Sequence, residues 1–363
     1  MKPVYLSQFQ LCSALADNLP QAAIYYAQGK QPLPTYADDV LSLPYFAVPS
    51  SDKSLHLRLK QLLKTTLDAA NLTAADCLLL VASTALDVGL LEQRLEQGVP
   101  LSYALMPSYD SFSQKVDDGF NFAAVRIINT ACTSAANALL YSQRFLQLGL
   151  YRHVLVLAFE PPGKITRSGF STLELTSQSG QYRPFHPQRD GLILGEAYAT
   201  AIVSKTADFN PIAKLLGGYS ACDTYNITTT AEDGNHIAQV MQLALEKSGV
   251  NQDEIALLKL HGTATPANDT AETNGILRLF TNKVPPLAVL KPYLGHTLGA
   301  CGLSELALLF TTLQDNPLPA LPYANEASLP FSNKELSLNT QDIVMANFFG
   351  FGGNNASLLL RKC

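Results

Sequence analysis

The apolar residues of this chain fall into short runs separated by polar segments, and the runs have two different spacings. Seven of them are continuous, mostly rich in leucine or β-branched residues, and have the length of buried strands. These predicted strands are Cys77–Val81, Val125–Ile128, Val154–Ala158, Ala199–Val203, Ile255–Leu260, Leu287–Leu290 and Ile343–Phe348. Helical spacing predicts helices over Ala138–Leu148, Asn235–Lys247 and Leu298–Leu313, the first two ending near Gly149 and Gly249. The alternation predicts an α/β protein with buried sheets.

The segment Val125–Ala158 combines both patterns and contains the first candidate for chemistry. A strand-like run leads into Asn129–Ala136, a turn made mostly of small and hydroxyl-bearing residues, and a helix and a second strand follow. This order is typical of a βαβ crossover. It places Cys132 near a helix N-terminus, where the positive end of the helix dipole favours a thiolate. The alternative is a small residue that only fills a tight contact between helix and sheet.

Length and composition exclude several classes of protein. The 363 residues allow two domains or one duplicated domain. Lys and Arg number 25 against 30 Asp and Glu, and only 15% of residues are charged, so nucleic acid is not an expected partner. The apolar runs are far shorter than the roughly 18 residues that a membrane span needs. Because the first ten residues also lack the apolar core of a secretory signal, we expect a cytoplasmic protein without membrane insertion.

The cysteines give no sign of a disulfide framework or of a metal site. They lie far apart, without a Cys-x-x-Cys pair or a histidine at zinc-ligand spacing. Their positions are Cys12, Cys77, Cys132, Cys222, Cys301 and Cys363. Each is by default a small buried hydrophobe, so a functional role needs further support.

Two later segments supply that support for Cys132, because each places a histidine directly after a strand-like run. His261 follows the run that ends at Leu260, and His296 follows Lys291 in the segment after Leu290. The glycine-rich turn Gly350–Gly353 follows the last long strand and suits close approach of the backbone to a ligand. Since α/β proteins gather reactive groups at strand ends, these residues are expected to meet in one site.

Five segments, in this order, resemble the motifs of the elongating β-ketoacyl-acyl-carrier-protein synthases, condensing enzymes with the thiolase fold. They are Ala131–Ser134 (nucleophile turn), Arg183–Gly191 with Gly195 and Glu196 (central signature), His261–Pro266 and Lys291–Gly302 (histidine motifs) and Gly350–Gly353 (terminal turn). The resemblance covers most of the chain. It implies two duplicated α/β halves in a layered α-β-α-β-α arrangement, which we place at residues 1–205 and 206–363.

The resemblance also implies a role for each candidate residue. Cys132 would accept an acyl group as a thioester from the phosphopantetheine of an acyl carrier protein. His261 and His296 would stabilise the enolate formed when a malonyl group loses carbon dioxide, and Lys291 would orient them. The backbone N–H groups of Cys132 and Phe351 would form the oxyanion hole, and Phe351 would also gate the acyl tunnel. No cofactor of the protein's own is implied.

Three carboxylates are implied to support this site. Glu305 would pair with Lys291, because a buried lysine and a buried carboxylate are both costly without partners. Asp269 and Glu272, which follow His261 in the sequence, would position water or the malonyl carboxylate.

An alternative function stays open on the sequence. In polyketide and polyene systems a condensing enzyme pairs with a related, non-condensing subunit, the chain length factor, which completes the dimer and shapes the tunnel. Such subunits typically lose the nucleophile, whereas Cys132 and both histidines are present here, which favours a working enzyme. A degradative thiolase would need a second cysteine in place of Phe351–Gly353. The expected partners are an acyl carrier protein and, in a homodimer or heterodimer, a second copy or a related ketosynthase.

Overall fold

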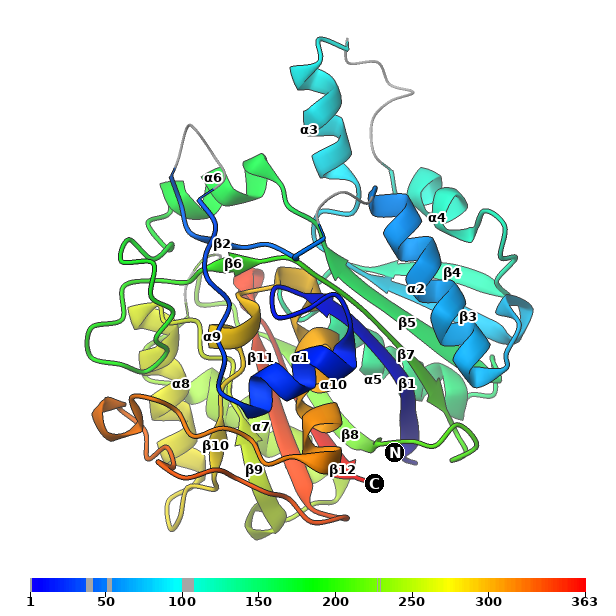
Figure 1. Cartoon of the computed structure of the whole chain (residues 1–363). Coiled ribbons are helices and arrows are strands. Elements are labelled where there is room, and N and C mark those ends of the chain that lie inside the picture. Colours follow the sequence, from blue (N-terminus) through cyan, green and yellow to red (C-terminus); the bar gives the residue numbers. More distant parts are fainter. Residues whose placement is uncertain (1, 37–41, 51–53, 100–107, 227, 229) are drawn as a thin grey trace.

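The computed structural model describes residues 2–36, 42–50, 54–99, 108–226, 228 and 230–363 (Figure 1). The strands of the first half are β1 (Val4–Ser13), β3 (Cys77–Ala82), β4 (Ala124–Ile128), β5 (His153–Glu160) and β7 (Ala197–Ser204). Those of the second half are β8 (Ala213–Cys222), β9 (Ile255–Lys259), β10 (Leu287–Ala288), β11 (Ile343–Phe349) and β12 (Asn354–Lys362). The short strands β2 (Tyr45–Phe46) and β6 (Leu194–Gly195) pair with each other.

The helices of the first half are α1 (Leu19–Ala27), α2 (Leu55–Ala70), α3 (Val88–Glu96), α4 (Tyr109–Asp117), α5 (Ser134–Gln147) and α6 (Lys164–Thr172). Those of the second half are α7 (Asn235–Ser248), α8 (Pro266–Leu279), α9 (Lys291–Leu294) and α10 (Cys301–Asp315). All three predicted helices are present. Helix α5 begins four residues before the predicted start, because its first turn consists of small residues that are buried without an apolar pattern. The predicted start at Leu298 is a short 3₁₀ turn that leads into α10.

The strands form one ten-stranded sheet in the order β10-β9-β11-β12-β8-β1-β7-β5-β3-β4. Each half repeats the same arrangement. In the first half, β1 pairs antiparallel with β7, β7 pairs antiparallel with β5, and β5, β3 and β4 follow as parallel neighbours. In the second half, β8, β12, β11, β9 and β10 make the same pairings in the same order. The sheets of the two halves are continuous, because β1 and β8 lie at their inner edges and pair antiparallel over Val4–Leu6. The division at residues 205 and 206 stays a prediction.

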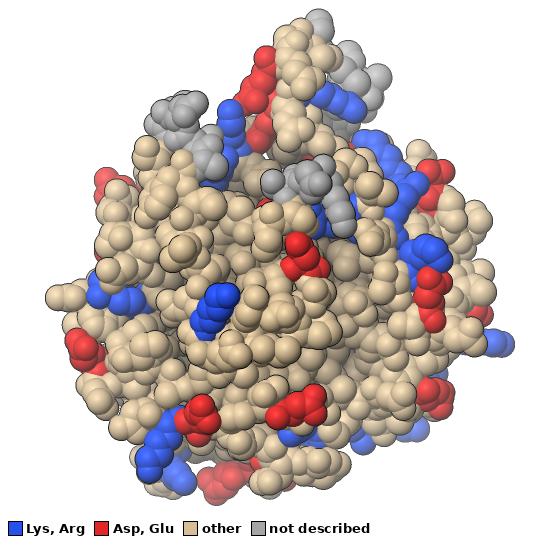
Figure 2. Space-filling model, viewed as in Figure 1, with Lys and Arg blue, Asp and Glu red and all other residues tan. Residues whose placement is uncertain are grey.

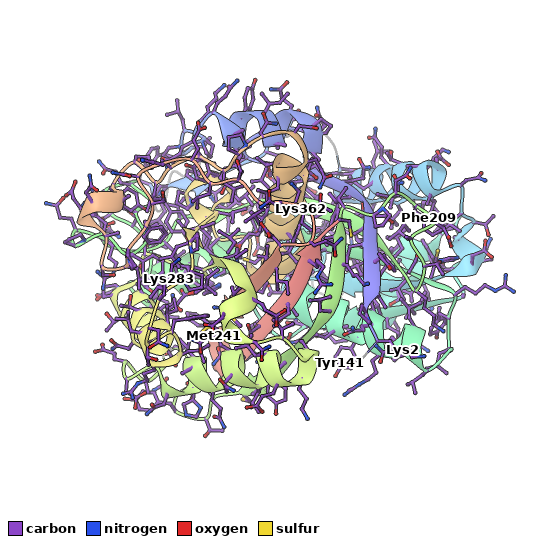
Figure 3. All side chains as sticks on the ribbon, turned by 90° about the horizontal axis from the view of Figure 1, so that it is seen from below. Lys2, Tyr141, Phe209, Met241, Lys283 and Lys362 are labelled. Carbon is purple, nitrogen blue, oxygen red and sulfur yellow. The ribbon has the colours of Figure 1, made fainter. Side chains whose placement is uncertain are left out.

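The sheet is covered in layers. In β3, Cys77, Leu79 and Val81 pack on α2 and α4, whereas Leu78 and Leu80 face a central cluster that contains residues of α5 and α10. In the second half, α7 and α8 cover the outer face of the sheet and α10 covers the inner face, as the view from below shows (Figure 3). These five layers confirm the predicted α-β-α-β-α fold class.

The two halves contact each other at the N-terminal ends of the central helices α5 and α10. At Gly302, near the start of α10, a Cβ atom would lie 2.3 Å from the backbone nitrogen of Ala136 on α5, so the two helix starts are in contact. Helix α5 follows Cys132, while β9 leads to His261 and β11 leads to Phe351. Residues far apart in the sequence therefore meet at one edge of the sheet.

The surface agrees with the low charge of the sequence. On the face shown in Figure 2, basic and acidic side chains are scattered among uncharged ones. Within the described ranges, no helix is long and apolar enough to cross a membrane.

Candidate active site

The turn between β4 and α5 holds Cys132 in a fixed position. Ala131 has a φ of +52°, a left-handed conformation that is unusual for a residue with a side chain. Hydroxyl groups lock this turn: Ser134 Oγ donates to the Ala131 carbonyl at 2.6 Å, and Thr133 Oγ1 donates to the Thr130 carbonyl at 2.7 Å. The Cys132 side chain is buried but lines a cavity of about 210 Å³. A rigid turn that presents a thiol to a cavity suits a nucleophile.

The protonation state of Cys132 differs from the sequence expectation. Burial raises the pKa of the Cys132 thiol to about 12, and the nearby Cys301 and Glu160 also raise it. The Lys291 ammonium and a hydrogen bond from the Phe351 backbone N–H oppose this shift. We expected a thiolate from the helix N-terminus, but removal of the sulfur from water outweighs that effect. The resting form is therefore the thiol.

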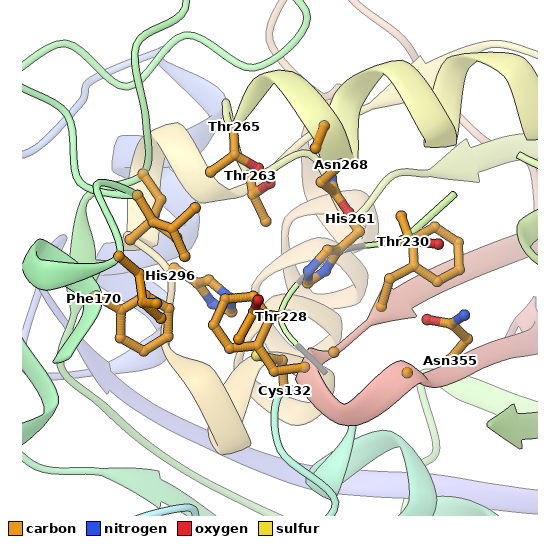
Figure 4. Close-up of a pocket in the computed structure, with 18 residues that line it drawn as sticks. Cys132, Phe170, Thr228, Thr230, His261, Thr263, Thr265, Asn268, His296 and Asn355 are labelled. Atoms are coloured by element: carbon orange, nitrogen blue, oxygen red, sulfur yellow. Dashed lines mark hydrogen bonds between the residues drawn. The ribbon is translucent and has the colours of Figure 1, made fainter. Parts of the chain in front are cut away.

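His261 and His296 lie on the same cavity and turn their rings toward Cys132 (Figure 4). Their ring centroids are 5.4 Å apart with the planes nearly perpendicular at 84°. Burial, followed by the positive charge of Lys291, lowers the pKa of both imidazoles well below the ordinary value. Both histidines are therefore neutral at physiological pH.

The partners of each ring fix which nitrogen carries the proton. The Leu298 backbone N–H donates to His296 Nδ1 at 3.2 Å, and Lys291 Nζ donates to His261 Nδ1 at 3.2 Å. Since Nδ1 accepts in both rings, Nε2 carries the proton in both. The Cys301 sulfur also lies 3.2 Å from His296 Nδ1, whereas the sequence suggested only a packing role for this cysteine. Two neutral N–H donors are thus available beside Cys132.

Lys291 is fully buried and uses all three of its ammonium hydrogens. The ammonium group donates to His261 Nδ1, to the His261 carbonyl at 2.7 Å and to Glu305 Oε1 at 2.7 Å. The other oxygen, Glu305 Oε2, forms an ion pair with Lys259, a second fully buried lysine. Lys259 was assigned no role from the sequence. The signal that could have found it is a single charged residue inside the apolar run that became β9.

Asp269 and Glu272 contact the backbone of the His261 loop. Glu272 accepts from the N–H groups of His261 and Gly262 at 2.7 and 2.8 Å. Asp269 Oδ1 accepts from the N–H groups of Thr263 and Ala264 at 3.1 and 3.2 Å. Neither carboxylate is among the residues that line the cavity. These contacts position the loop, while a direct role toward water or the malonyl carboxylate stays a prediction.

The terminal glycine turn lies directly against Cys132. A Cβ atom on Gly350 would be 3.1 Å from the Cys132 backbone nitrogen, which explains a glycine there. The Phe351 backbone N–H donates to the Cys132 sulfur. The Phe351 ring stacks on Phe170 of α6, with ring centroids 5.3 Å apart. The oxyanion-hole and gate roles of this turn stay predictions.

The remaining cavity wall has a polar part and an apolar part (Figure 4). Thr263 and Thr265, with their hydroxyl oxygens 2.8 Å apart, lie on the polar part. Leu173, Leu175 and Leu192 lie on the apolar part. Sequence reasoning missed these residues, because nothing in their own segments marks them. Among the described residues, no group of three or more His, Cys, Asp or Glu side chains could hold a metal ion.

Comparison with known proteins gives related sequences over about two thirds of the chain. The chain is 29% identical over 250 residues to 3-oxoacyl-[acyl-carrier-protein] synthase 2 of Synechocystis sp., which covers 64% of this chain and 60% of that protein. It is 28% identical over 274 residues to a putative mitochondrial 3-oxoacyl-[acyl-carrier-protein] synthase of Schizosaccharomyces pombe. This match covers 68% of this chain and 64% of that protein. The chain thus spans less than two thirds of the length of the curated relatives it matches.

Solved structures share the fold over the whole chain. One is a ketosynthase in complex with its chain length factor from Xenorhabdus doucetiae, with a TM-score of 0.85 at 24% identity over 100% of this chain and 98% of the other. Another is a β-ketoacyl synthase from Burkholderia phymatum, with a TM-score of 0.81 at 24% identity over all of both chains. Family models for the N-terminal and C-terminal domains of β-ketoacyl synthase match residues 106–208 and 212–324. The chain therefore belongs to the β-ketoacyl synthase family.

Proposed function

We propose that this chain is a β-ketoacyl-acyl-carrier-protein synthase, which joins an acyl thioester on Cys132 to a malonyl group with loss of carbon dioxide. The observation that carries the proposal is the meeting of a rigidly held thiol with two neutral imidazole N–H donors on one cavity. Family membership supports the same reaction. The acyl and malonyl groups would arrive on the phosphopantetheine of an acyl carrier protein, so no bound cofactor is needed.

In the first step, the Cys132 sulfur attacks the thioester carbonyl of the acyl carrier protein. The new C–S bond forms as the old one breaks, and the proton of the Cys132 thiol ends on the departing phosphopantetheine sulfur. Because burial raises the pKa of Cys132 to about 12, this proton must leave as the attack proceeds. The tetrahedral intermediate carries negative charge on its oxygen, and each N–H donor aimed at such an oxygen contributes about 3–4 kcal/mol.

In the second step, the malonyl thioester loses carbon dioxide and leaves an enolate. The two Nε2–H groups of His261 and His296 donate hydrogen bonds to the enolate oxygen and keep their protons. Both rings are neutral, and Nδ1 of each ring accepts a hydrogen bond, so the proton stays on Nε2. The enolate carbon then attacks the acyl thioester on Cys132. A C–C bond forms, the C–S bond breaks, and the Cys132 sulfur leaves as a thiolate that takes up a proton from water.

A dimer with a second copy or a related subunit is part of the proposal. The edge strand β4 supports it, since none of its five residues is buried and its outer edge has no partner strand within the described sheet. Side chains such as Val125 and Ile127 are half-buried there, and the exposed Tyr141 extends from the neighbouring α5. Apolar side chains beside an open edge favour pairing with another chain.

A chain-length-factor-like subunit is the second candidate. Two of the structural relatives are complexes of a ketosynthase with a chain length factor, and their fold is the fold of this chain. The presence of Cys132 in a competent setting favours the condensing enzyme.

The test distinguishes the two candidates by covalent loading. The purified protein is mixed with an acyl-acyl carrier protein, and the intact mass is measured. The condensing enzyme gains one acyl group on Cys132, which Cys132→Ala abolishes and Cys363→Ser leaves in place. If the wild-type protein stays unloaded while Cys132→Ala leaves a co-purified ketosynthase fully active, the chain-length-factor function is correct instead.

A further inference from the structure

Two buried lysines share one buried glutamate behind the histidines. Lys259, Lys291 and Glu305 are each 0% exposed. Lys291 Nζ lies 2.7 Å from Glu305 Oε1, and Lys259 Nζ pairs with Glu305 Oε2. A buried ion pair normally contains one cation for one anion, because an unbalanced buried charge is costly. The second cation therefore needs an explanation.

The surroundings of Lys259 are those of a charged ammonium group. Besides Glu305, it donates to the Asn347 carbonyl at 2.9 Å, and its nitrogen lies 3.6 Å from the centroid of the Phe348 ring. An aromatic face attracts a cation, so all three ammonium hydrogens have favourable partners. These three contacts, one from α10 and two from β11, hold the side chain in one position. Lys259 thus fixes the orientation of Glu305.

Lys259 determines the sign of the net charge of the buried groups next to the histidines. The next carboxylate, Glu272, is bound by the His261 and Gly262 N–H groups, and burial raises its pKa to about 7. Near neutral pH, two ammonium groups, the Glu305 carboxylate and a partly ionised Glu272 together carry between zero and one positive charge. Without Lys259 the same set would carry between zero and one negative charge. A negative charge there would oppose enolate formation.

We propose that Lys259 is a positioning residue of the condensation site, which holds Glu305 for Lys291 and supplies the second buried positive charge that keeps His261 and His296 neutral. Its influence passes from Lys259 through Glu305 and Lys291 to His261. The proposal deepens the condensation function and rests on it.

The pH dependence of this arrangement follows from the groups around Lys259. These are Glu305 and Cys301 from α10, Lys291 from α9 and Glu272 from α8, together with the two histidines. Burial lowers the pKa of Lys259 to about 8, although the Glu305 carboxylate opposes the shift. The ammonium form is therefore present below pH 8 and is lost above it.

The first experiment measures the histidines themselves and needs no substrate. In protein labelled with ¹⁵N-histidine, the imidazole resonances are followed from pH 8 down to the lowest pH at which the protein stays folded, in the wild type, Lys259→Met and Lys259→Arg. Removal of one buried positive charge is expected to raise the His261 titration midpoint by about one pH unit, and arginine is expected to restore it. Lys362→Met is the matched control, because Lys362 is a largely buried lysine bound to the Leu338 carbonyl away from the site. An unchanged His261 midpoint in folded Lys259→Met overturns the proposal.

The second experiment follows carbon dioxide release from a malonyl-acyl carrier protein. The wild-type rate is expected to fall above pH 8, where Lys259 loses its charge. Lys259→Met is expected to lower the rate about tenfold with little change in KM and to lose that fall. An unaltered pH profile would count against the proposal. If the wild type itself releases no carbon dioxide, the condensation function fails, whereas the imidazole titration still decides the effect of Lys259. If Lys259→Met does not fold, Lys259→Gln takes its place, since its amide can donate to the Asn347 carbonyl.

Discussion

Replacement of Gly302 by alanine tests whether the contact between the two central helices determines the geometry of the site. The added Cβ would lie 2.3 Å from the Ala136 nitrogen and 2.9 Å from the Ala135 carbonyl carbon. Since an ordinary contact is roughly 3.5 Å, α10 must move away from α5 by about 1 Å. Overpacking of this kind costs about 1–3 kcal/mol, and backbone atoms cannot rotate away as side chains can, so we expect a loss of about 2 kcal/mol.

The same shift is expected to affect chemistry more than stability. Helix α10 carries Glu305, which orients Lys291, while α5 begins beside Cys132. A displacement of about 1 Å between such groups can cost about a hundredfold in rate. Urea denaturation gives the stability, and the rate of Cys132 acylation gives the effect on the site.

Gly169→Ala is the matched control, because Gly169 also lies in a helix but has open space around its Cβ position. It is expected to keep or increase stability by up to about 1 kcal/mol through helix propensity. A Gly302→Ala protein with a urea midpoint equal to that of the wild type would refute the close contact between α5 and α10. A lowered urea midpoint together with normal acylation would refute the dependence of the site on that contact.

Two further predictions concern the nucleophile and its neighbouring turn. Phe351→Ala removes the stack on Phe170, so malonyl decarboxylation should begin without prior acylation of Cys132; rapid-mixing kinetics identical to the wild type would exclude a gate at this position. Because the pKa of Cys132 is about 12, its alkylation by iodoacetamide should accelerate about tenfold for each pH unit between pH 7 and pH 9. A plateau in that range, measured on the Cys132 peptide by mass spectrometry, would mean that the resting cysteine is already a thiolate.

Seven strands of the ten-stranded sheet and the chemical candidates could be predicted from the sequence, because their signals are local. The apolar run before Asn129 and the helix before Gly149 are each encoded within about ten residues, and the structure has β4 and α5 there. The motifs around Cys132, His261 and His296 also depend on adjacent residues only. The strands β1 and β8, which pair with each other and join the two halves, were missed. Polar residues interrupt the apolar residues of β1, and Gly217 and Gly218 interrupt those of β8.

Tertiary structure decided the properties that arise from contacts between distant residues. The charge state of Cys132 depends on how much protein surrounds the sulfur, and burial reversed the expectation drawn from its helix terminus. The tasks of Asp269 and Glu272 depend on which backbone groups fold against them.

Lys259 shows the same division most clearly. In the sequence, Lys259 is a single charged residue in an otherwise apolar strand. Its carboxylate partner, Glu305, comes from α10 and is brought close only by the fold. By itself, the sequence determined the family and indicated Cys132, His261 and His296 as candidate residues, because local motifs specify them. The folded chain decided their protonation, their tautomers and the buried charges behind them, because electrostatic energies inside a protein depend on burial and on neighbours brought together by packing.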